Sequence, residues 1–142
     1  MFTRVWQLAC YGGFLTGREA ARYMLPRGHG TILFTGATAS VRGGAGFAAF
    51  AAAKFGLRAL AQSMARELGP HNIHVAHLVI DGGLDSEAIH RRRAAAGETA
   101  DNLPPDALIQ TGSVAEAYWM LHQQPRDGWT HELDLRPYIE RW

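Results

Sequence analysis

GTILFTG at residues 30–36 is an apolar run without polar alternation, as expected of a strand that is buried on both faces. The loop at residues 42–46 contains three glycines and does not favour regular structure. Residues 47–68 are rich in Ala, Leu, Arg, Gln and Glu, which are good helix formers. This helix should end at Gly69 and Pro70, because glycine suits a left-handed cap and proline blocks continuation. A strand, a loop and a long helix therefore form the unit around which the rest of the chain is expected to fold.

The flanking sequence extends this unit into an α/β pattern. Five more elements are predicted: a helix at 3–25, a buried strand at 72–80, a helix at 85–96, a helix at 113–122 and a half-buried strand at 129–135. Ser113 and Glu116 have the spacing of a capping box, which predicts where the fourth helix begins. The first helix contains three glycines, so we expect it to pack closely against a neighbour. The order predicts one α/β domain over residues 1–142, with a three-stranded parallel sheet and flanking helices.

Composition excludes several classes of function. A chain of 142 residues with a formal net charge of +1 offers little electrostatic attraction for nucleic acid or an anionic membrane. No apolar run approaches the roughly 20 residues that span a bilayer, and the first residues do not read as a signal peptide. The single cysteine, Cys10, excludes an intrachain disulfide and fits a reducing compartment. We therefore expect a cytoplasmic protein without a membrane segment.

Residues 44–49, GAGFAA, match the form of a dinucleotide-binding fingerprint, but their context argues against it. The fingerprint needs a tight turn directly between a strand and a helix, with an acidic residue about 20 positions further on. Here residues 37–43 separate the strand from the glycines, and Glu67 lies within the same helix. We interpret these glycines as loop residues.

Three other sets of residues suggest chemistry less strongly. His71, His74 and His77 alternate faces of a strand, so they cannot hold one metal ion together, and no metal site is predicted. A histidine with Ser40 and Asp81 supplies the residue types of a hydrolase, but GxSxG is absent. The basic run at residues 91–93 either clamps an anion or forms a solvated helix face, and the second is the more common case.

The strand, the loop, the segment FAAAK at residues 50–54 and the stretch through Val75 resemble the short-chain dehydrogenase/reductase family. In that family the long helix carries a Tyr-x-x-x-Lys motif, with a serine thirteen residues before the tyrosine and an asparagine on the preceding helix. The resemblance places Lys54 at the lysine, Phe50 at the tyrosine, Ala37 at the serine and Ala9 at the asparagine. Only the lysine is therefore retained.

The resemblance implies where a site would lie. Thr38 and Ser40 are hydroxyls near the lost serine that either bind a substrate oxygen or hydrogen-bond the loop backbone. Lys54 either contacts a ribose or an anion, or extends from a helix flank into solvent. A family element that lines the nicotinamide pocket falls near Asp81, Gly82 and Gly83. A simple turn after the strand explains these three residues nearly as well.

The resemblance covers only the C-terminal half of the family's fold. It implies a truncated Rossmann-like half-domain, with NAD(P) as a possible cofactor but no phosphate-binding motif in this chain. In the family the two long helices form a common dimer interface. We therefore expect a homo-oligomer through the helices at 3–25 and 47–68, with the exposed edge of the strand at 31–35 as a further contact.

Two hypotheses for function follow. In the first, the chain is a divergent NAD(P)-dependent oxidoreductase or ligand-binding protein, acting on a carbonyl or alcohol, whose cofactor-binding half lies elsewhere. In the second, it is a non-catalytic oligomerising or ligand-binding module.

Overall fold

The computed structural model describes residues 1–98 and 103–141. Its elements are α1 (Phe2–Trp6), η1 (Gln7–Tyr11), α2 (Gly12–Met24), η2 (Leu25–Arg27), β1 (Gly30–Ala37), η3 (Thr38–Ser40), α3 (Ala48–Leu68), η4 (Gly69–His71), β2 (Ile73–Ile80), α4 (Glu87–Ala95), α5 (Thr111–Gln123), η6 (Arg126–Gly128) and β3 (Glu132–Leu135). The η1 segment is a π-helical turn, and the other η segments are 3-10 helices. The predicted α/β order is confirmed.

The three strands form one parallel sheet in the order β1-β2-β3, as predicted. β1 pairs with β2 along its whole length, from Gly30 opposite Ile73 to Ala37 opposite Ile80. Every residue of β2 is buried, which explains its apolar sequence without alternation. The outer edge of β1 has no strand neighbour in the described part of the chain.

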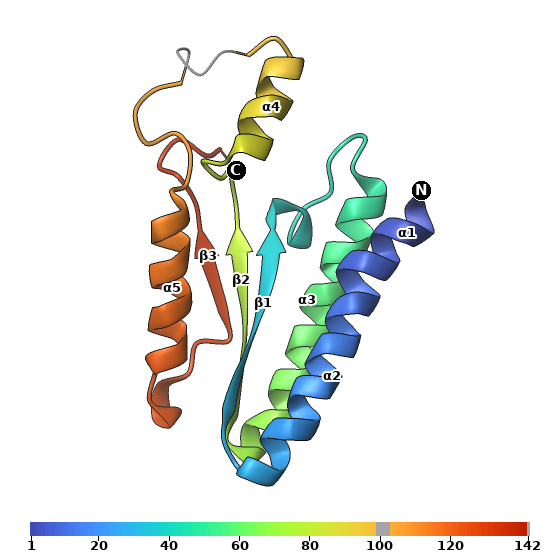
Figure 1. Ribbon diagram of the computed structural model, residues 1–142, viewed down its shortest axis with the longest axis vertical. Helices are drawn as coiled ribbons and strands as arrows, with labels where there is room; N and C mark the ends of the chain where they lie inside the picture. The colour runs from blue at the N-terminus through green and yellow to red at the C-terminus, as the bar shows by residue number, and fades with distance from the viewer. Residues whose placement is uncertain (99–102, 142) are drawn as a thin grey trace.

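Helices cover both faces of the sheet (Figure 1). The continuous α1–η1–α2 segment and α3 lie on one side, α5 lies on the other, and α4 sits beyond the upper ends of the strands. Two apolar clusters form the core. The first joins β1 and β2 to α2 and α3 through Ile32, Phe34, Leu57, Met64 and Val75, and the second joins β2 to α5 through Ala76, Leu78, Ile80 and Leu121.

The predicted helix at 3–25 is one continuous helical segment that packs closely on α3. A Cβ atom added at Gly13 would lie 2.5 Å from Cδ1 of Leu57, and one at Gly17 would lie 2.9 Å from Sδ of Met64. Glycine at these positions lets the two helices approach, as the sequence suggested. The π-helical turn inside the segment was not predicted.

Three predicted element starts are wrong by two residues or more. The helix expected from residue 85 begins at Glu87, with Ser86 as its N-cap. The helix expected to begin with a cap at Ser113 begins two residues earlier, at Thr111, and its N-cap residue is Gln110, which makes no side-chain capping bond. The preceding Ile109 already bridges Leu84, so the chain enters α5 directly from that contact. The strand expected at 129–135 begins only at Glu132.

Packing of the predicted strand's first residues explains that late start. The Trp129 ring stacks on His74, with ring centroids 4.9 Å apart, and the N–H of Thr130 donates to the side chain of Gln124. The polar loop at 97–105 has a sequence of the kind that forms a lid, but its residues 99–102 lie outside the described ranges. No helix in the described ranges is both long and apolar enough to cross a membrane.

Candidate functional site

A cavity of about 650 Å³ lies where β1 and β2 end, between α3 and α4. Its apolar wall comes from the loop after β1, the start of α3 and the start of α4. The lining residues are Thr35, Gly36, Ala37, Thr38, Ala39, Arg42, Gly43, Gly44, Phe47, Phe50, Lys54, Ile80, Gly82, Leu84, Ser86, Ala88, Ile89 and Arg92. The carboxyl ends of parallel strands are where ligands bind in α/β proteins.

The structure places some predicted site residues in this cavity and others outside it. Thr38, Phe50, Lys54 and Gly82 line it, together with Ala37 at the family's serine position. The other predicted residues, Ala9, Ser40, Asp81 and Gly83, are not among its lining residues. Gly83 lines a smaller cavity of about 410 Å³, to which residues of α4 also contribute.

Lys54 extends from α3 to the cavity wall. Its Nζ atom donates a hydrogen bond to the carbonyl oxygen of Thr35 at 2.8 Å and lies 5.7 Å from the centre of the Phe50 ring. Partial burial lowers the pKa of the Lys54 ammonium below its usual value. Lys54 is therefore fixed at the wall rather than extended into solvent.

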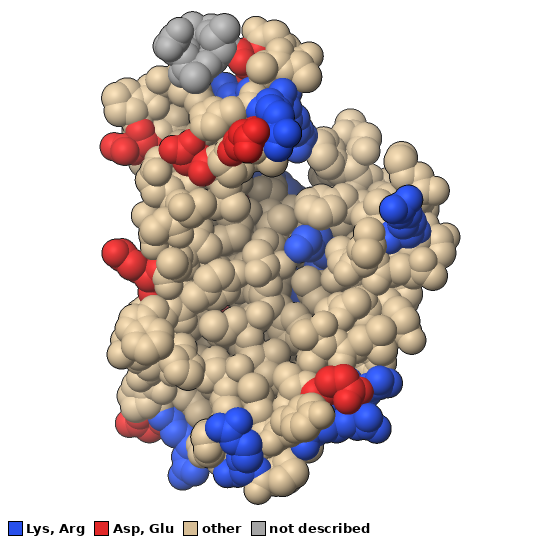
Figure 2. All heavy atoms as spheres, in the orientation of Figure 1, with Lys and Arg blue, Asp and Glu red and all other residues tan. Residues whose placement is uncertain are grey.

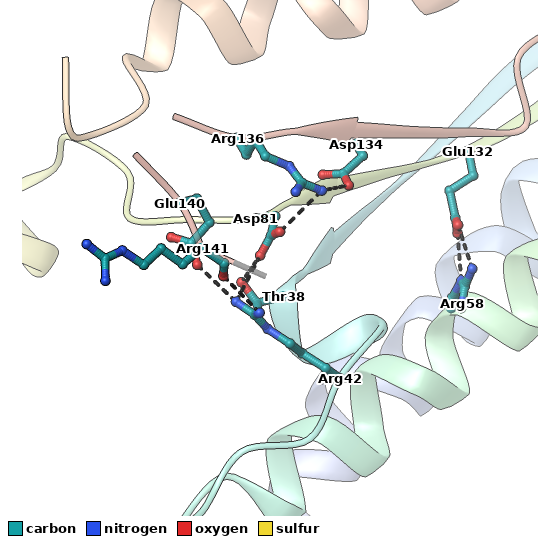
Figure 3. Close-up of polar contacts among 9 residues, drawn as sticks. All are labelled: Thr38, Arg42, Arg58, Asp81, Glu132, Asp134, Arg136, Glu140 and Arg141. Atoms are coloured by element: carbon teal, nitrogen blue, oxygen red, sulfur yellow. Dashed lines mark hydrogen bonds and ion pairs between the residues drawn. The ribbon is translucent and has the colours of Figure 1, made fainter. Parts of the chain in front are cut away.

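Asp81 does not line the cavity but lies at the centre of a polar network that includes two lining residues, Thr38 and Arg42 (Figure 3). The Thr38 hydroxyl donates to Oδ1 of Asp81 at 2.6 Å, and Arg136 lies 3.5 Å from Oδ2. Arg42 lies 3.9 Å from Asp81 and forms a closer ion pair with Glu140 at 2.9 Å. The network ties the ends of β1 and β2 to the C-terminal segment, so the Asp81 carboxylate is engaged by its neighbours.

Gly82 allows the C-terminal segment to cross beside the cavity. Its φ angle is +151°, and a Cβ atom there would lie 2.6 Å from Cδ of Pro137. Glycine at this position is explained by that close approach, without a cofactor.

Ser40 and His77 form a buried cluster behind the cavity. Both side chains are fully buried, and the Ser40 hydroxyl accepts a hydrogen bond from the Ala37 N–H at 3.0 Å. His77 Nδ1 lies 2.9 Å from Oε2 of Glu132, which also accepts two bonds from Arg58 at 2.6 and 2.7 Å. The structure therefore gives no hydrolase triad: Asp81 belongs to another network, Nε2 of His77 has no hydrogen-bond partner among the described residues, and solvent reaches neither Ser40 nor His77.

Burial governs the charges of this cluster. Desolvation lowers the pKa of His77, against the opposing effect of Glu132, so the imidazole is neutral at pH 7. The hydrogen bonds from Arg58, and next the one from His77, lower the pKa of Glu132. Because the ionised carboxylate only accepts, His77 Nδ1 carries the proton that it donates.

Sequence reasoning gave an anion clamp at residues 91–93 only as the less common alternative, and it did not select Phe47. Arg92 on α4 lies over the Phe47 ring, 5.5 Å from its centre, and both residues line the cavity. No spacing in the sequence distinguishes Arg92 from the arginines beside it. Adjacent residues of a helix point in different directions, and which of them faces the cavity depends on how the helix is oriented in the fold.

No group of three potential metal ligands occurs in the ranges 1–98 and 103–141.

The family model described as short chain dehydrogenase matches residues 1–96. The chain is 40% identical over 72 residues to a (21S)-21-acetoxyl-apo-melianone synthase SDR of Melia azedarach, a match covering 51% of this chain and 27% of that protein.

Solved structures match nearly the whole chain. A short-chain dehydrogenase from Rhodopseudomonas palustris matches with 54% identity and a TM-score of 0.73, over 96% of this chain and 52% of that one. An alcohol dehydrogenase from the archaeon Thermococcus sibiricus, complexed with 5-hydroxy-NADP, matches with 20% identity and a TM-score of 0.76, over 99% of this chain and 55% of that one, which shows the shared fold. The chain thus spans about half the length of these solved proteins.

Proposed function

The chain belongs to the short-chain dehydrogenase family, and on that premise we propose that its cavity binds the nicotinamide end of NAD(P) beside a small apolar ligand. In this proposal no tyrosine is present at the site to act as acid and base. One observation carries the proposal. Lys54 lies at the wall of an apolar cavity, and the residue beside it at the family's tyrosine position is Phe50.

The cavity fits the nicotinamide ribose in size and in donors. A volume of about 650 Å³ lies within the range of roughly 300–1,000 Å³ that is usual for small-molecule sites. Lys54 uses one donor on the Thr35 carbonyl, and an ammonium has three, so two donors are available to ribose hydroxyls. When bound, the nicotinamide would supply a site for hydride transfer.

The described residues do not offer a cradle for the pyrophosphate. β1 ends at Ala37 and α3 begins at Ala48, with η3 and a loop between them. A dinucleotide fingerprint requires a tight turn at that place. The proposal therefore assigns only the nicotinamide end of the cofactor to this chain.

The cavity offers no replacement for the family's acid–base group. Phe50 has no ionisable proton, and general acid–base catalysis is usually worth about a hundredfold or more in rate. The cavity hydroxyls of Thr35, Thr38 and Ser86 bond to Tyr118, to Asp81 and to the first turn of α4 respectively. We therefore propose that binding, rather than rapid carbonyl reduction, is the function of this site.

Calorimetric titration of the chain with NADPH and NADH tests the proposal. We expect saturable binding that is weakened in Lys54→Met and kept in Arg66→Met, a change to an exposed cation on the same helix. Absence of binding at millimolar cofactor, or equal affinity in both variants, would overturn the assignment of the nicotinamide ribose to Lys54.

A second proposal is self-association through the helical face, supported by aromatic side chains that the fold leaves exposed. Trp6, Tyr11 and Phe14 on the first helical segment and Phe55 on α3 are all at least partly exposed, and burying such rings against a second copy would be favourable. Sedimentation velocity should show a species larger than a monomer that Phe55→Glu dissociates. Trp119→Glu, on α5 across the sheet, is the matched control.

A further inference from the structure

The cavity is lined by three cations and by no acidic residue. Arg42, Lys54 and Arg92 line it, whereas all of its other lining residues are uncharged. Figure 2 shows Lys and Arg side chains above and below the hollow that opens between α4 and α3. Because most of the wall is apolar, water screens these charges less than it would on an open surface.

Two of the three cations have no carboxylate partner in the described part of the chain. Arg42 is paired with Glu140 at 2.9 Å. Lys54, in contrast, contacts only the Thr35 carbonyl and the Phe50 ring, and Arg92 contacts the Phe47 ring. The positive charge at the cavity is therefore not balanced by the protein groups that line it.

Arg92 differs from the arginines on either side of it. Arg91 pairs with Glu87 on the outer face of α4 at 3.7 Å, and Arg93 pairs with Glu98 at 2.8 Å. Only the middle arginine lies over an aromatic ring at the mouth of the large cavity. The cation–π contact with Phe47 uses none of the five N–H donors that the Arg92 guanidinium carries.

We propose that the ligand of this cavity is a small apolar molecule with an anionic group, which Arg92 binds at the mouth while Phe47, Phe50, Leu84 and Ile89 contact its apolar body. This inference rests on the proposed ligand-binding function and adds the chemical class of the ligand. A guanidinium binds a carboxylate or a phosphate through two parallel hydrogen bonds. The anion belongs either to the apolar ligand or to a nucleotide, and the two sources are separable by experiment.

Binding of three probes tests the inference: 2-naphthoate, its uncharged analogue 2-naphthamide, and nicotinamide mononucleotide. Affinities are measured by calorimetry for the native chain, for Arg92→Leu and for Arg91→Leu, which removes the same charge from the same helix outside the cavity. We expect naphthoate to bind more tightly than naphthamide and to lose about fivefold in affinity in Arg92→Leu, the upper end for a solvent-exposed pair. Added salt should weaken naphthoate binding and leave naphthamide binding unchanged.

The outcomes separate this inference from the proposed function. Equal affinity for naphthoate and naphthamide, together with unchanged mononucleotide binding in Arg92→Leu, overturns the anionic ligand and leaves binding of an apolar molecule intact. Equal losses in Arg92→Leu and Arg91→Leu overturn the role of Arg92. A loss confined to the mononucleotide supports the anion site and assigns the anion to the nucleotide, whereas binding of none of the probes overturns both the inference and the proposed function.

Discussion

Replacing Glu132 with alanine should destabilise the protein much more than removing its arginine partner. Glu132 accepts from both Arg58 and His77. The ion pair with Arg58 is about one-third exposed on each side and is worth at most about 1 kcal/mol. His77 is fully buried, so losing its acceptor leaves an unsatisfied buried donor, which costs about 1–3 kcal/mol. We expect a loss of about 2–4 kcal/mol for Glu132→Ala and about 1 kcal/mol or less for Arg58→Met.

Urea and thermal unfolding, followed by circular dichroism, measure this difference. At roughly 4 °C per kcal/mol, Glu132→Ala should lower Tm by about 8–16 °C and Arg58→Met by about 4 °C or less. Glu19→Ala removes an exposed carboxylate that is also paired with arginines, and it should change Tm little. If Arg58→Met lowers Tm as much as Glu132→Ala does, then the bond to His77 contributes nothing and the reasoning is refuted.

Three more predictions concern pH, packing and chemistry. Burial holds the pKa of His77 below its usual 6.5, so below that pH the folded state binds fewer protons than the unfolded state. The unfolding free energy should therefore fall as pH drops below 6.5, and His77→Gln should flatten that decline. Gly36→Ala places a Cβ atom 2.4 Å from Nε2 of His77 and should cost about 1–3 kcal/mol in urea unfolding, unlike Gly43→Ala, where a Cβ atom meets nothing within 4 Å. If the nicotinamide binds as proposed, Phe50→Tyr with Ala37→Ser should raise NADPH-dependent reduction of an aldehyde by about a hundredfold, and unchanged turnover despite nucleotide binding would contradict this.

The fold was predictable because its main elements have strong local signals. The largely apolar runs of β1 and β2 predicted strands, and the helix formers of α3 predicted a helix that stops at Gly69 and Pro70. Two details of these predictions are wrong: β1 is not buried on both faces, because Thr35 is exposed, and Gly69 is right-handed, so that the left-handed residue is Asn72. Weaker elements depended on contacts that are distant in the sequence. β3 lost its first three predicted residues because Trp129 and Thr130 pack on β2 and on the end of α5 instead.

The site was predictable only as a location. Strand order and the resemblance placed Thr38, Phe50 and Lys54 together, and the cavity contains all three. Which polar side chains face the cavity depends on the loops that follow the strands. Within a strand the direction of a side chain alternates from residue to residue, but in a loop no such regular pattern predicts it. Ser40 and Asp81 turn away from it into buried hydrogen bonds, and Arg92 turns toward it from a helix whose orientation no local pattern specifies.

The polar residues around the cavity explain how its wall keeps its shape with a phenylalanine at position 50. Thr38 and Asp81 bond to one another and hold the end of β1 against the end of β2. Ser40 bonds the backbone of the same turn, and Lys54 bonds the last part of β1. Each of these bonds maintains the shape of the cavity wall and none of them requires a tyrosine at position 50. Phe50 is therefore compatible with an intact cavity, and under the proposed function its apolar surface would favour a ligand with an aromatic or aliphatic body.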